Sequence, residues 1–241
     1  MSRVEGAALL ALSLLALSLL AMPAAAQLSV ERRADLTQSV VLGPDQAAVV
    51  FAFRRDTAQL GQASMLSWLR YDLAKRSLVA RPADAKKRGL TTTYAFQVRD
   101  KGRKLAVDYA VLVVSAGSYV LGGATADPNT GIKDIFCFGA PVFTVAAGEV
   151  AYIGDFMPFG LRRHALGELS NVLAYRADLA AARTALAARP ELTAKIVQAT
   201  LSNGAVYPCY GGRFYAYDLP GLGRLPLDPA IPDATIPPDT P

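Results

Sequence analysis

The chain contains a single histidine, His164, and this limits the chemistry open to it. Any serine or cysteine nucleophile activated by an imidazole would depend on this residue, and neither a Gly-x-Ser-x-Gly nor a Ser-x-x-Lys motif occurs. His164 and Glu168 are spaced as neighbours on a helix, but two ligands do not complete a zinc site. We therefore expect an ordinary surface histidine, no metal and no cofactor.

Carboxylates are the remaining candidates for acid–base chemistry, because a pair of them can hydrolyse a glycosidic bond. Near the glycine-rich segments the acids are Glu149, Asp155 and Glu168. The first follows Ala147-Gly148, which predicts a solvated hairpin turn. Asp155 is expected to close a strand and cap a backbone N–H. A carboxylate-based hydrolase is thus one hypothesis, weaker than the two given below.

The segment from Asp127 to Phe138 partly matches a calcium-binding loop, with Asn129, Gly131 and Asp134 in it. Phe138 stands where such a loop needs its last acidic ligand, so Asp127 to Gly131 is better interpreted as a turn. Gly122-Gly123 is not followed by a phosphate-loop lysine, and dinucleotide fingerprints are missing.

The two cysteines, Cys137 and Cys209, are far apart in sequence. In an oxidising compartment such a pair predicts one disulfide, which would close a loop of about 70 residues. The alternative is two free thiols at a metal or redox site. A metal site lacks further ligands, and redox pairs usually lie close together in sequence.

Aromatic residues concentrate between Tyr207 and Tyr217, where four tyrosines could line a groove for a sugar or a peptide. These candidate ligand-binding residues are Tyr207, Tyr210, Tyr215 and Tyr217. The alternative is a strand with one face in the core.

The first 26 residues have the order of a secretory signal peptide: a basic start, an apolar run and small residues before the cut. The alternative, a membrane anchor, requires about 20 apolar residues, and the run from Ala7 to Leu20 is shorter. We expect a mature chain beginning near Gln27 and exported to the periplasm or outer envelope.

The formal net charge of +5 and the isoelectric point of 9.3 favour anionic partners such as lipid headgroups or acidic polysaccharide. The basic residues are scattered, however, and the clusters Lys86 to Arg88 and Arg99 to Lys104 are interpreted as solvated turns. Nucleic acid is disfavoured by the export signal.

Short strands separated by glycine turns predict a mainly β fold, an antiparallel β-sandwich. The expected strands are 47–53, 65–71, 78–80, 91–98, 105–114, 142–145, 150–156 and 169–175, and a turn followed by a strand is expected within 116–121. A short helix is the alternative for 65–71. A helical hairpin is expected over about 177–200, with Pro190 opening its second helix. Leu192, Ile196 and Ala199 would share one face of that helix, and Asn203-Gly204 would end it.

The domain organisation follows from these elements. Residues 27–218 form a single β-rich domain, and 219–241 form a proline-rich tail of polyproline character. An ordered segment laid over the domain is the alternative for the tail.

Two runs, Ala116 to Leu121 and Phe143 to Gly154, resemble a pattern of uncharacterised bacterial envelope proteins with small transthyretin-like or immunoglobulin-like sandwiches. That pattern reads Pro-Gly-x-Tyr-x-Leu followed by Ala-Gly-x-x-x-Tyr-Ile-Gly, and Ala116 replaces its proline. The resemblance implies that Tyr119 and Tyr152 are core-facing aromatics with their hydroxyls at a rim. It covers about 40 residues and implies no catalytic residues.

The leading hypothesis from the sequence is a non-catalytic exported protein that acts through contacts with another envelope protein. The second is a binding module for an anionic small or polymeric ligand, using the four tyrosines.

Overall fold

The computed structural model describes residues 34–54, 65–85, 87–99, 106–125, 134–163, 169–207, 213–216 and 223–224. The predicted signal peptide, residues 100–104 of the predicted basic turn, and the predicted tail 219–241 apart from Gly223–Arg224 lie outside these ranges. None of the helices in the described part is both long and apolar enough to pass through a lipid bilayer.

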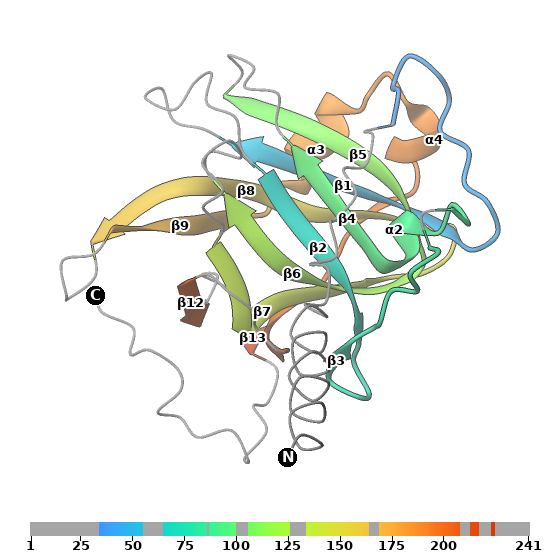
Figure 1. Ribbon diagram of the computed structural model, residues 1–241. Helices are drawn as coiled ribbons and strands as arrows, with labels where there is room; N and C mark the ends of the chain where they lie inside the picture. The colour runs from blue at the N-terminus through green and yellow to red at the C-terminus, as the bar shows by residue number, and fades with distance from the viewer. Residues whose placement is uncertain are drawn as a thin grey trace, which may run out of the picture.

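The fold is mainly β, as predicted, and its strands form two curved sheets packed on each other (Figure 1). The five-stranded sheet contains β1 (Gln46–Arg54), β5 (Val107–Ser115), β8 (Val150–Arg163), β9 (Leu169–Arg176) and β10 (Ile196–Gln198). The eight-stranded sheet contains β2 (Met65–Asp72), β3 (Ser77–Leu78), β4 (Ala95–Arg99), β6 (Gly117–Thr125), β7 (Asp134–Val145), β11 (Leu201–Val206), β12 (Arg213–Ala216) and β13 (Gly223–Arg224). Three short helices are described: α2 (Thr91–Tyr94), α3 (Leu179–Ala185) and α4 (Pro190–Thr193).

Strand β1 is buried on both faces, because its sequence is apolar almost without interruption. Val49, Phe51 and Phe53 point into the core between the sheets, where Trp68 and Phe156 pack against the same aromatic cluster. Ala48 and Val50 face the other way, toward α3, α4 and the segment 34–42. The chain therefore has a second, smaller core outside the five-stranded sheet.

Sheet pairing differs from the predicted antiparallel sandwich. Most ladders are antiparallel, but β8 pairs in parallel with both β1 and β10, β7 pairs in parallel with β12, and β11 pairs in parallel with β13. The 147–149 turn also does not close a hairpin, since β7 and β8 belong to different sheets. The chain crosses from one sheet to the other there, and again at Ala116 and between β10 and β11.

Two local predictions in the C-terminal half are wrong. The predicted helical face of Leu192, Ile196 and Ala199 is broken, because α4 ends at Thr193 and Ile196 begins β10, which fills the edge of β8. Asn203-Gly204 does not end a helix but lies inside β11, in a bulge where Gly204 has φ +107°. The two short helices lie within the expected region, but the predicted hairpin is not confirmed.

In the first half, the strand predicted from Thr91 begins later than expected. Residues 91–94 form the single turn α2, and β4 starts at Ala95, where pairing with β2 becomes available. Likewise the strand predicted at 78–80 is the two-residue β3.

Asn203 is fully buried in β11, and neither atom of its side-chain amide has a hydrogen-bond partner. A buried, unpaired amide lowers stability by about 1–3 kcal/mol, and an apolar side chain of similar shape removes that cost. Asn203→Leu is therefore expected to raise the free energy of unfolding by about 1–2 kcal/mol, measured by urea denaturation. Ser202→Ala, one residue earlier and half-buried, is the control and should change it little; a destabilised Asn203→Leu would show that the amide is satisfied.

Candidate functional site

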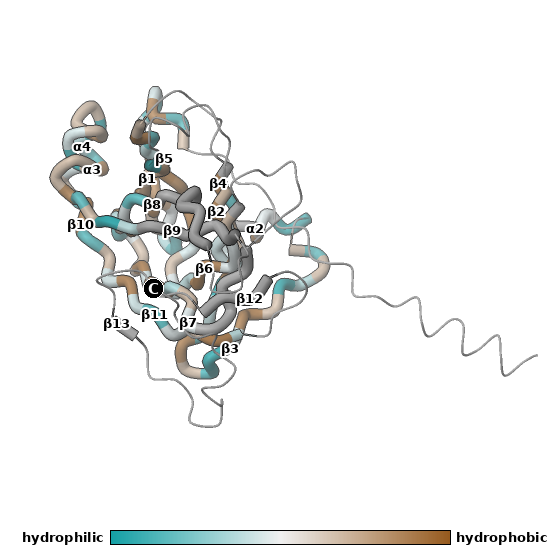
Figure 2. Tube along the Cα trace, turned by 90° about the vertical axis from the view of Figure 1, so that its left-hand side faces the viewer, coloured by the Kyte–Doolittle hydropathy of each residue, from teal (hydrophilic) through white to brown (hydrophobic). Residues whose placement is uncertain are grey.

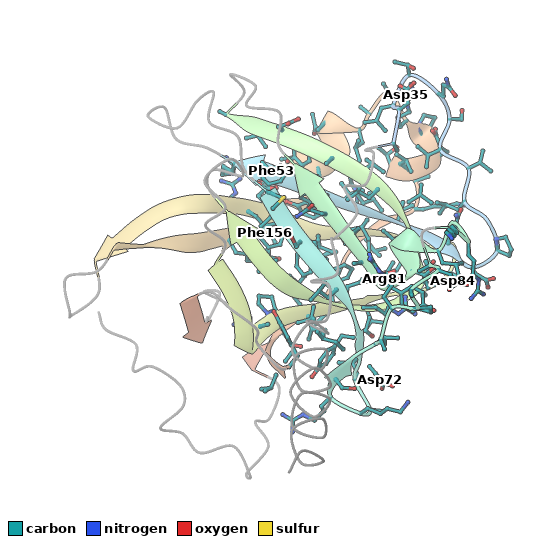
Figure 3. All side chains as sticks on the ribbon, in the orientation of Figure 1. Asp35, Phe53, Asp72, Arg81, Asp84 and Phe156 are labelled. Carbon is teal, nitrogen blue, oxygen red and sulfur yellow. The ribbon has the colours of Figure 1, made fainter. Side chains whose placement is uncertain are left out.

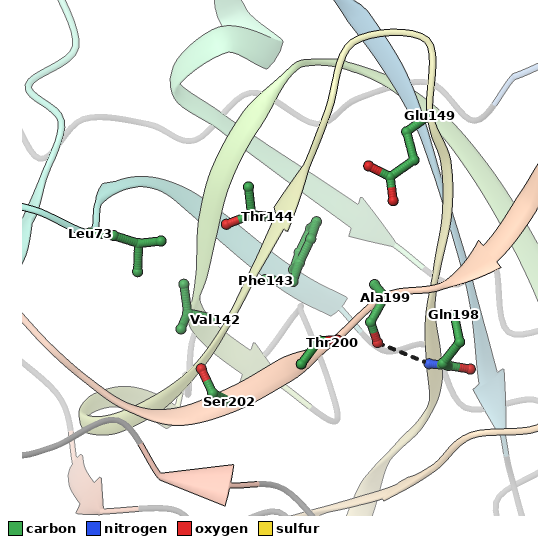
Figure 4. Close-up of a pocket in the computed structure, with 9 residues that line it drawn as sticks. All are labelled: Leu73, Val142, Phe143, Thr144, Glu149, Gln198, Ala199, Thr200 and Ser202. Carbon is green, nitrogen blue, oxygen red and sulfur yellow. Dashed lines mark hydrogen bonds between the residues drawn. The ribbon is translucent and has the colours of Figure 1, made fainter.

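A groove opens at the end of the sandwich where the chain crosses between the sheets (Figure 4). Its walls come from the turn after β2, the end of β7, the 146–149 turn and the link between β10 and β11. The cavity volume is about 360 Å³. Nine residues line it: Leu73, Val142, Phe143, Thr144, Glu149, Gln198, Ala199, Thr200 and Ser202.

The floor of the groove is apolar and its walls are polar. Val142, Phe143 and Ala199 are buried core residues, so the floor is held by the packing of both sheets. Gln198 is fixed, because its side-chain amide donates to the carbonyls of Tyr152 (3.1 Å) and Ala199 (3.2 Å). The groove is thus built on strand ends with defined contacts, which is the arrangement expected of a pre-formed binding site.

Glu149 is the one charged residue among the nine that line the groove. It was expected to be solvated in a hairpin turn; instead it is half-buried, and Oε2 accepts a hydrogen bond from the Ala146 N–H (2.7 Å). Figure 4 shows its carboxylate pointing into the groove. Since Oε2 is held by the turn, Oε1 is the oxygen that can accept a hydrogen bond from a bound group.

The hydroxyl groups around the groove add further hydrogen-bond acceptors beside the Glu149 carboxylate. Thr144 shares a hydrogen bond with Ser118 (2.7 Å), while Thr200 is exposed on the link between β10 and β11 and Ser202 is half-buried. One carboxylate and several hydroxyls over an apolar floor suit a segment with an apolar body and N–H donors.

Asp155 is not in the groove; it is the centre of a buried ionic cluster. Its carboxylate is fully buried and accepts two hydrogen bonds from Arg54, at 2.8 and 3.2 Å. Arg176 lies 3.7 Å away, and the Tyr152 hydroxyl donates to the second oxygen. The prediction that Asp155 closes a strand and caps a backbone N–H is wrong, since β8 continues to Arg163.

A β-bulge in β8 explains why this carboxylate reaches the outer face of the sheet. The register against β1 shifts between Val50 and Phe51, so Ile153 is an extra residue on β8. Without the bulge, regular alternation from Tyr152 through Ile153 would turn Asp155 into the apolar core and Phe156 out of it. Gly154, at φ +107°, makes the bulge and lies against the Tyr175 ring.

The tyrosines around the cluster are held in their neutral form. Burial raises the pKa of Tyr152 above its usual range, and the hydrogen bond to Asp155 adds to this. Burial also raises the pKa of Tyr109 and of Tyr175, with the Asp155 charge as the second cause in each. Of these three hydroxyls, that of Tyr152 donates a hydrogen bond to the carboxylate, whereas the buried Tyr109 hydroxyl has no hydrogen-bond partner among the described residues.

Glu149 and Asp155 do not form a hydrolytic pair. Glu149 directly precedes β8, and Asp155 lies within this strand six residues later. A strand rises about 3.3 Å per residue, so their Cα atoms are separated by roughly 20 Å. Paired carboxylates in glycosidases are separated by about 5–9.5 Å. The hydrolase hypothesis is therefore wrong for these two acids, and Glu168 lies outside the described residues.

Of the four candidate tyrosines, Tyr207 is described in full and is a core residue. It is buried between the sheets, and its hydroxyl donates to the Leu121 carbonyl (2.9 Å). This placement matches the alternative of a strand with one face in the core and leaves Tyr207 little surface for a ligand. Tyr215 lies on β12, while Tyr210 and Tyr217 lie outside the described residues, so their role stays a prediction.

Several other predicted features fall outside the described part of the chain. They are His164, Cys209 and the turn 127–131, so the disulfide to Cys137 on β7 also stays a prediction. Within the described residues, no group of three or more metal-ligating side chains comes together. Tyr119 and Tyr152 are both fully buried, as expected, with their hydroxyls bonded to the Ser115 carbonyl (2.7 Å) and to Asp155.

Sequence reasoning missed most of the groove. Only Glu149 was considered, because the other lining residues are small or apolar and come from four separate segments. Arg54 and Arg176 were also missed as partners of Asp155, although Arg54 directly follows the predicted strand 47–53 and is the last residue of β1.

Comparison with known proteins gives little further information. No protein-family model and no curated protein matches the sequence. A crystal structure of a putative cell adhesion protein from Parabacteroides distasonis ATCC 8503 is similar over 56% of this chain, with 10% identity and a TM-score of 0.25. The match spans 38% of that protein's length. A similarity at this level does not confirm the transthyretin-like or immunoglobulin-like resemblance.

Proposed function

We propose that this chain is a non-catalytic exported protein that binds another protein of the cell envelope through the groove lined by Thr144, Glu149 and Thr200. The observation that supports it is the groove itself: an open cavity with an apolar floor, a carboxylate and several hydroxyls. Its volume is at the lower end of the range for ligand pockets. A few side chains of a partner would fill it, and such buried anchors often dominate the affinity of an interface.

The chemistry of the lining favours a partner segment that donates hydrogen bonds. The Glu149 carboxylate would face a lysine, an arginine or a backbone N–H, and the apolar floor would take the aliphatic part of that side chain. Because Gln198 and Glu149 are fixed by contacts within the chain, little conformational entropy would be lost on binding.

Filling the groove is the direct test of this proposal. Thr200→Trp is expected to remove the dominant partner when the tagged protein is captured from cells, because the indole would occupy the space of the anchor. Thr184→Trp, on the exposed side of α3, is the matched control and should leave capture unchanged. Capture of the same partner by Thr200→Trp, with export and melting temperature unaltered, would contradict the groove as the binding site.

A second candidate, a module for an anionic ligand, rests on the net charge of +5. The groove does not support it, since its one charged residue is an acid. The excess positive charge is concentrated outside the groove, in residues 72–90.

A further inference from the structure

Most of the excess positive charge of the chain lies in one segment, residues 72–90, here named the basic segment. It holds six basic and two acidic residues, a net charge of +4 against +5 for the whole chain. The basic residues are Lys75, Arg76, Arg81, Lys86, Lys87 and Arg88, and the acids are Asp72 and Asp84. The interpretation of the basic residues as scattered, with 86–88 an ordinary solvated turn, missed this concentration.

Three of the six basic side chains, those of Lys75, Lys87 and Arg88, are exposed and accessible to a partner. The side chain of Lys75 is 80% exposed and that of Arg88 is 58% exposed, and Lys87 is exposed too. Lys75 pairs with Asp72 at 3.4 Å, and Arg88 with Asp84 at 3.9 Å. Exposed pairs of this kind are weak, so an anionic surface can compete with them.

The basic segment has a defined shape. Strand β3 pairs with the end of β2, where Tyr71 is opposite Leu78 and Asp72 opposite Ser77. The Asp72 carboxylate accepts hydrogen bonds from the N–H groups of Ala74 and Lys75, both at 3.0 Å. The lysine is thus presented on a closed turn. In Figures 1 and 2, β3 lies at the opposite end of the molecule from α3 and α4.

Two apolar side chains stand among the basic ones. Leu73 is 44% exposed and Val79 is 37% exposed, and both flank the turn that carries Lys75. Figure 2 shows hydrophobic and hydrophilic stretches side by side around β3. Apolar side chains that enter the boundary of a bilayer, beside basic ones that contact anionic headgroups, are typical of membrane-surface binding. A soluble polyanion would give these exposed apolar groups no favourable environment.

We propose that the basic segment docks this protein on an anionic lipid surface, with Leu73 and Val79 at the headgroup boundary and Lys75, Lys87 and Arg88 against the headgroups. Each basic residue near such a surface contributes about 1 kcal/mol, so several together give useful affinity. This site does not depend on the groove, although Leu73 adjoins both. A partner in the groove would then be held close to the membrane plane.

The test is co-sedimentation of the purified protein with vesicles of phosphatidylcholine alone and of an equimolar mixture with phosphatidylglycerol. Binding is expected to the anionic vesicles only, and it should disappear at about 1 M salt, where the Debye length is about 3 Å. Lys75→Gln/Lys87→Gln should weaken it about thirtyfold, the equivalent of about 2 kcal/mol. Arg183→Gln/Lys195→Gln removes the same charge from α3 and from the turn after α4, and should weaken it less than about threefold.

A third variant distinguishes binding to a membrane surface from binding to a soluble polyanion. Val79→Ser keeps every charge and leaves the groove untouched, and it should weaken vesicle binding severalfold while leaving binding to polyphosphate unchanged. Equal binding to both kinds of vesicle, equal loss in the two double variants, or no effect of Val79→Ser would each overturn the proposal. Because only protein and lipid are present, the outcome does not depend on whether the groove has a partner.

Discussion

Gly154→Ala is expected to lower the free energy of unfolding by about 3–5 kcal/mol, the largest effect of any single change considered. Two causes add. The backbone of Gly154 has φ +107°, which side chains other than that of glycine rarely tolerate. A Cβ atom would also overlap the Tyr175 ring, which packs against Phe156 in the core. Chemical denaturation, with mutant and wild type side by side, measures the loss.

Gly148 is the control that measures how much of the loss comes from the positive φ alone. It also has a positive φ, +77°, but a Cβ atom there would have nothing within 4 Å. Gly148→Ala should therefore cost only about 1–2 kcal/mol, the penalty of the left-handed conformation. In a double-mutant cycle, Tyr175→Ala should recover part of the Gly154→Ala loss by removing the overlap. Equal losses at Gly148 and Gly154 would contradict the close packing against Tyr175.

Asp155→Ala is expected to lower the free energy of unfolding by about 3 kcal/mol. The change removes a fully buried carboxylate from Arg54 and Arg176 and leaves the buried Tyr152 hydroxyl without its acceptor. Loss of one partner from a buried pair costs about 3–5 kcal/mol, and we take the lower end because Arg54 and Arg176 are 24% and 50% exposed. Thermal and urea unfolding both measure it.

Asp155→Asn distinguishes charge from hydrogen bonding at the same position. It keeps an acceptor for Tyr152 and the shape of the side chain, so it should cost less than Asp155→Ala, about 1–2 kcal/mol. Asp84→Ala removes the exposed pair with Arg88 and should leave the melting temperature almost unchanged. An Asp155→Ala protein as stable as wild type would mean that the cluster does not join β1, β8 and β9.

The strands with the clearest patterns could be predicted from the sequence. Ala47 to Phe53 is an unbroken apolar run, and the structure makes it a central strand buried on both faces. The Gly148 turn was also placed correctly. The local sequence pattern could not predict to which sheet each flanking strand belongs. The same turn can close a hairpin or carry the chain from one sheet to the other. That choice depends on partners such as β1 and β11, distant in sequence.

The wrong predictions share this cause. Asn203-Gly204 is a common helix-ending pair, yet here the glycine makes a bulge inside β11. Ile196 continued a helical spacing, yet the open edge of β8 made a strand more favourable. The groove could not be predicted from the sequence either, because Leu73, Thr144 and Thr200 come together only where the chain crosses between the sheets.

Photo-crosslinking in cells would show whether the groove binds a protein partner. A photoreactive phenylalanine derivative would replace Thr200 at the groove or, as the control, Thr184 on α3. We expect one dominant protein adduct from position 200, identified by mass spectrometry, and its absence from position 184. No adduct from position 200 in an exported, folded protein, or the same adducts from both positions, would contradict it.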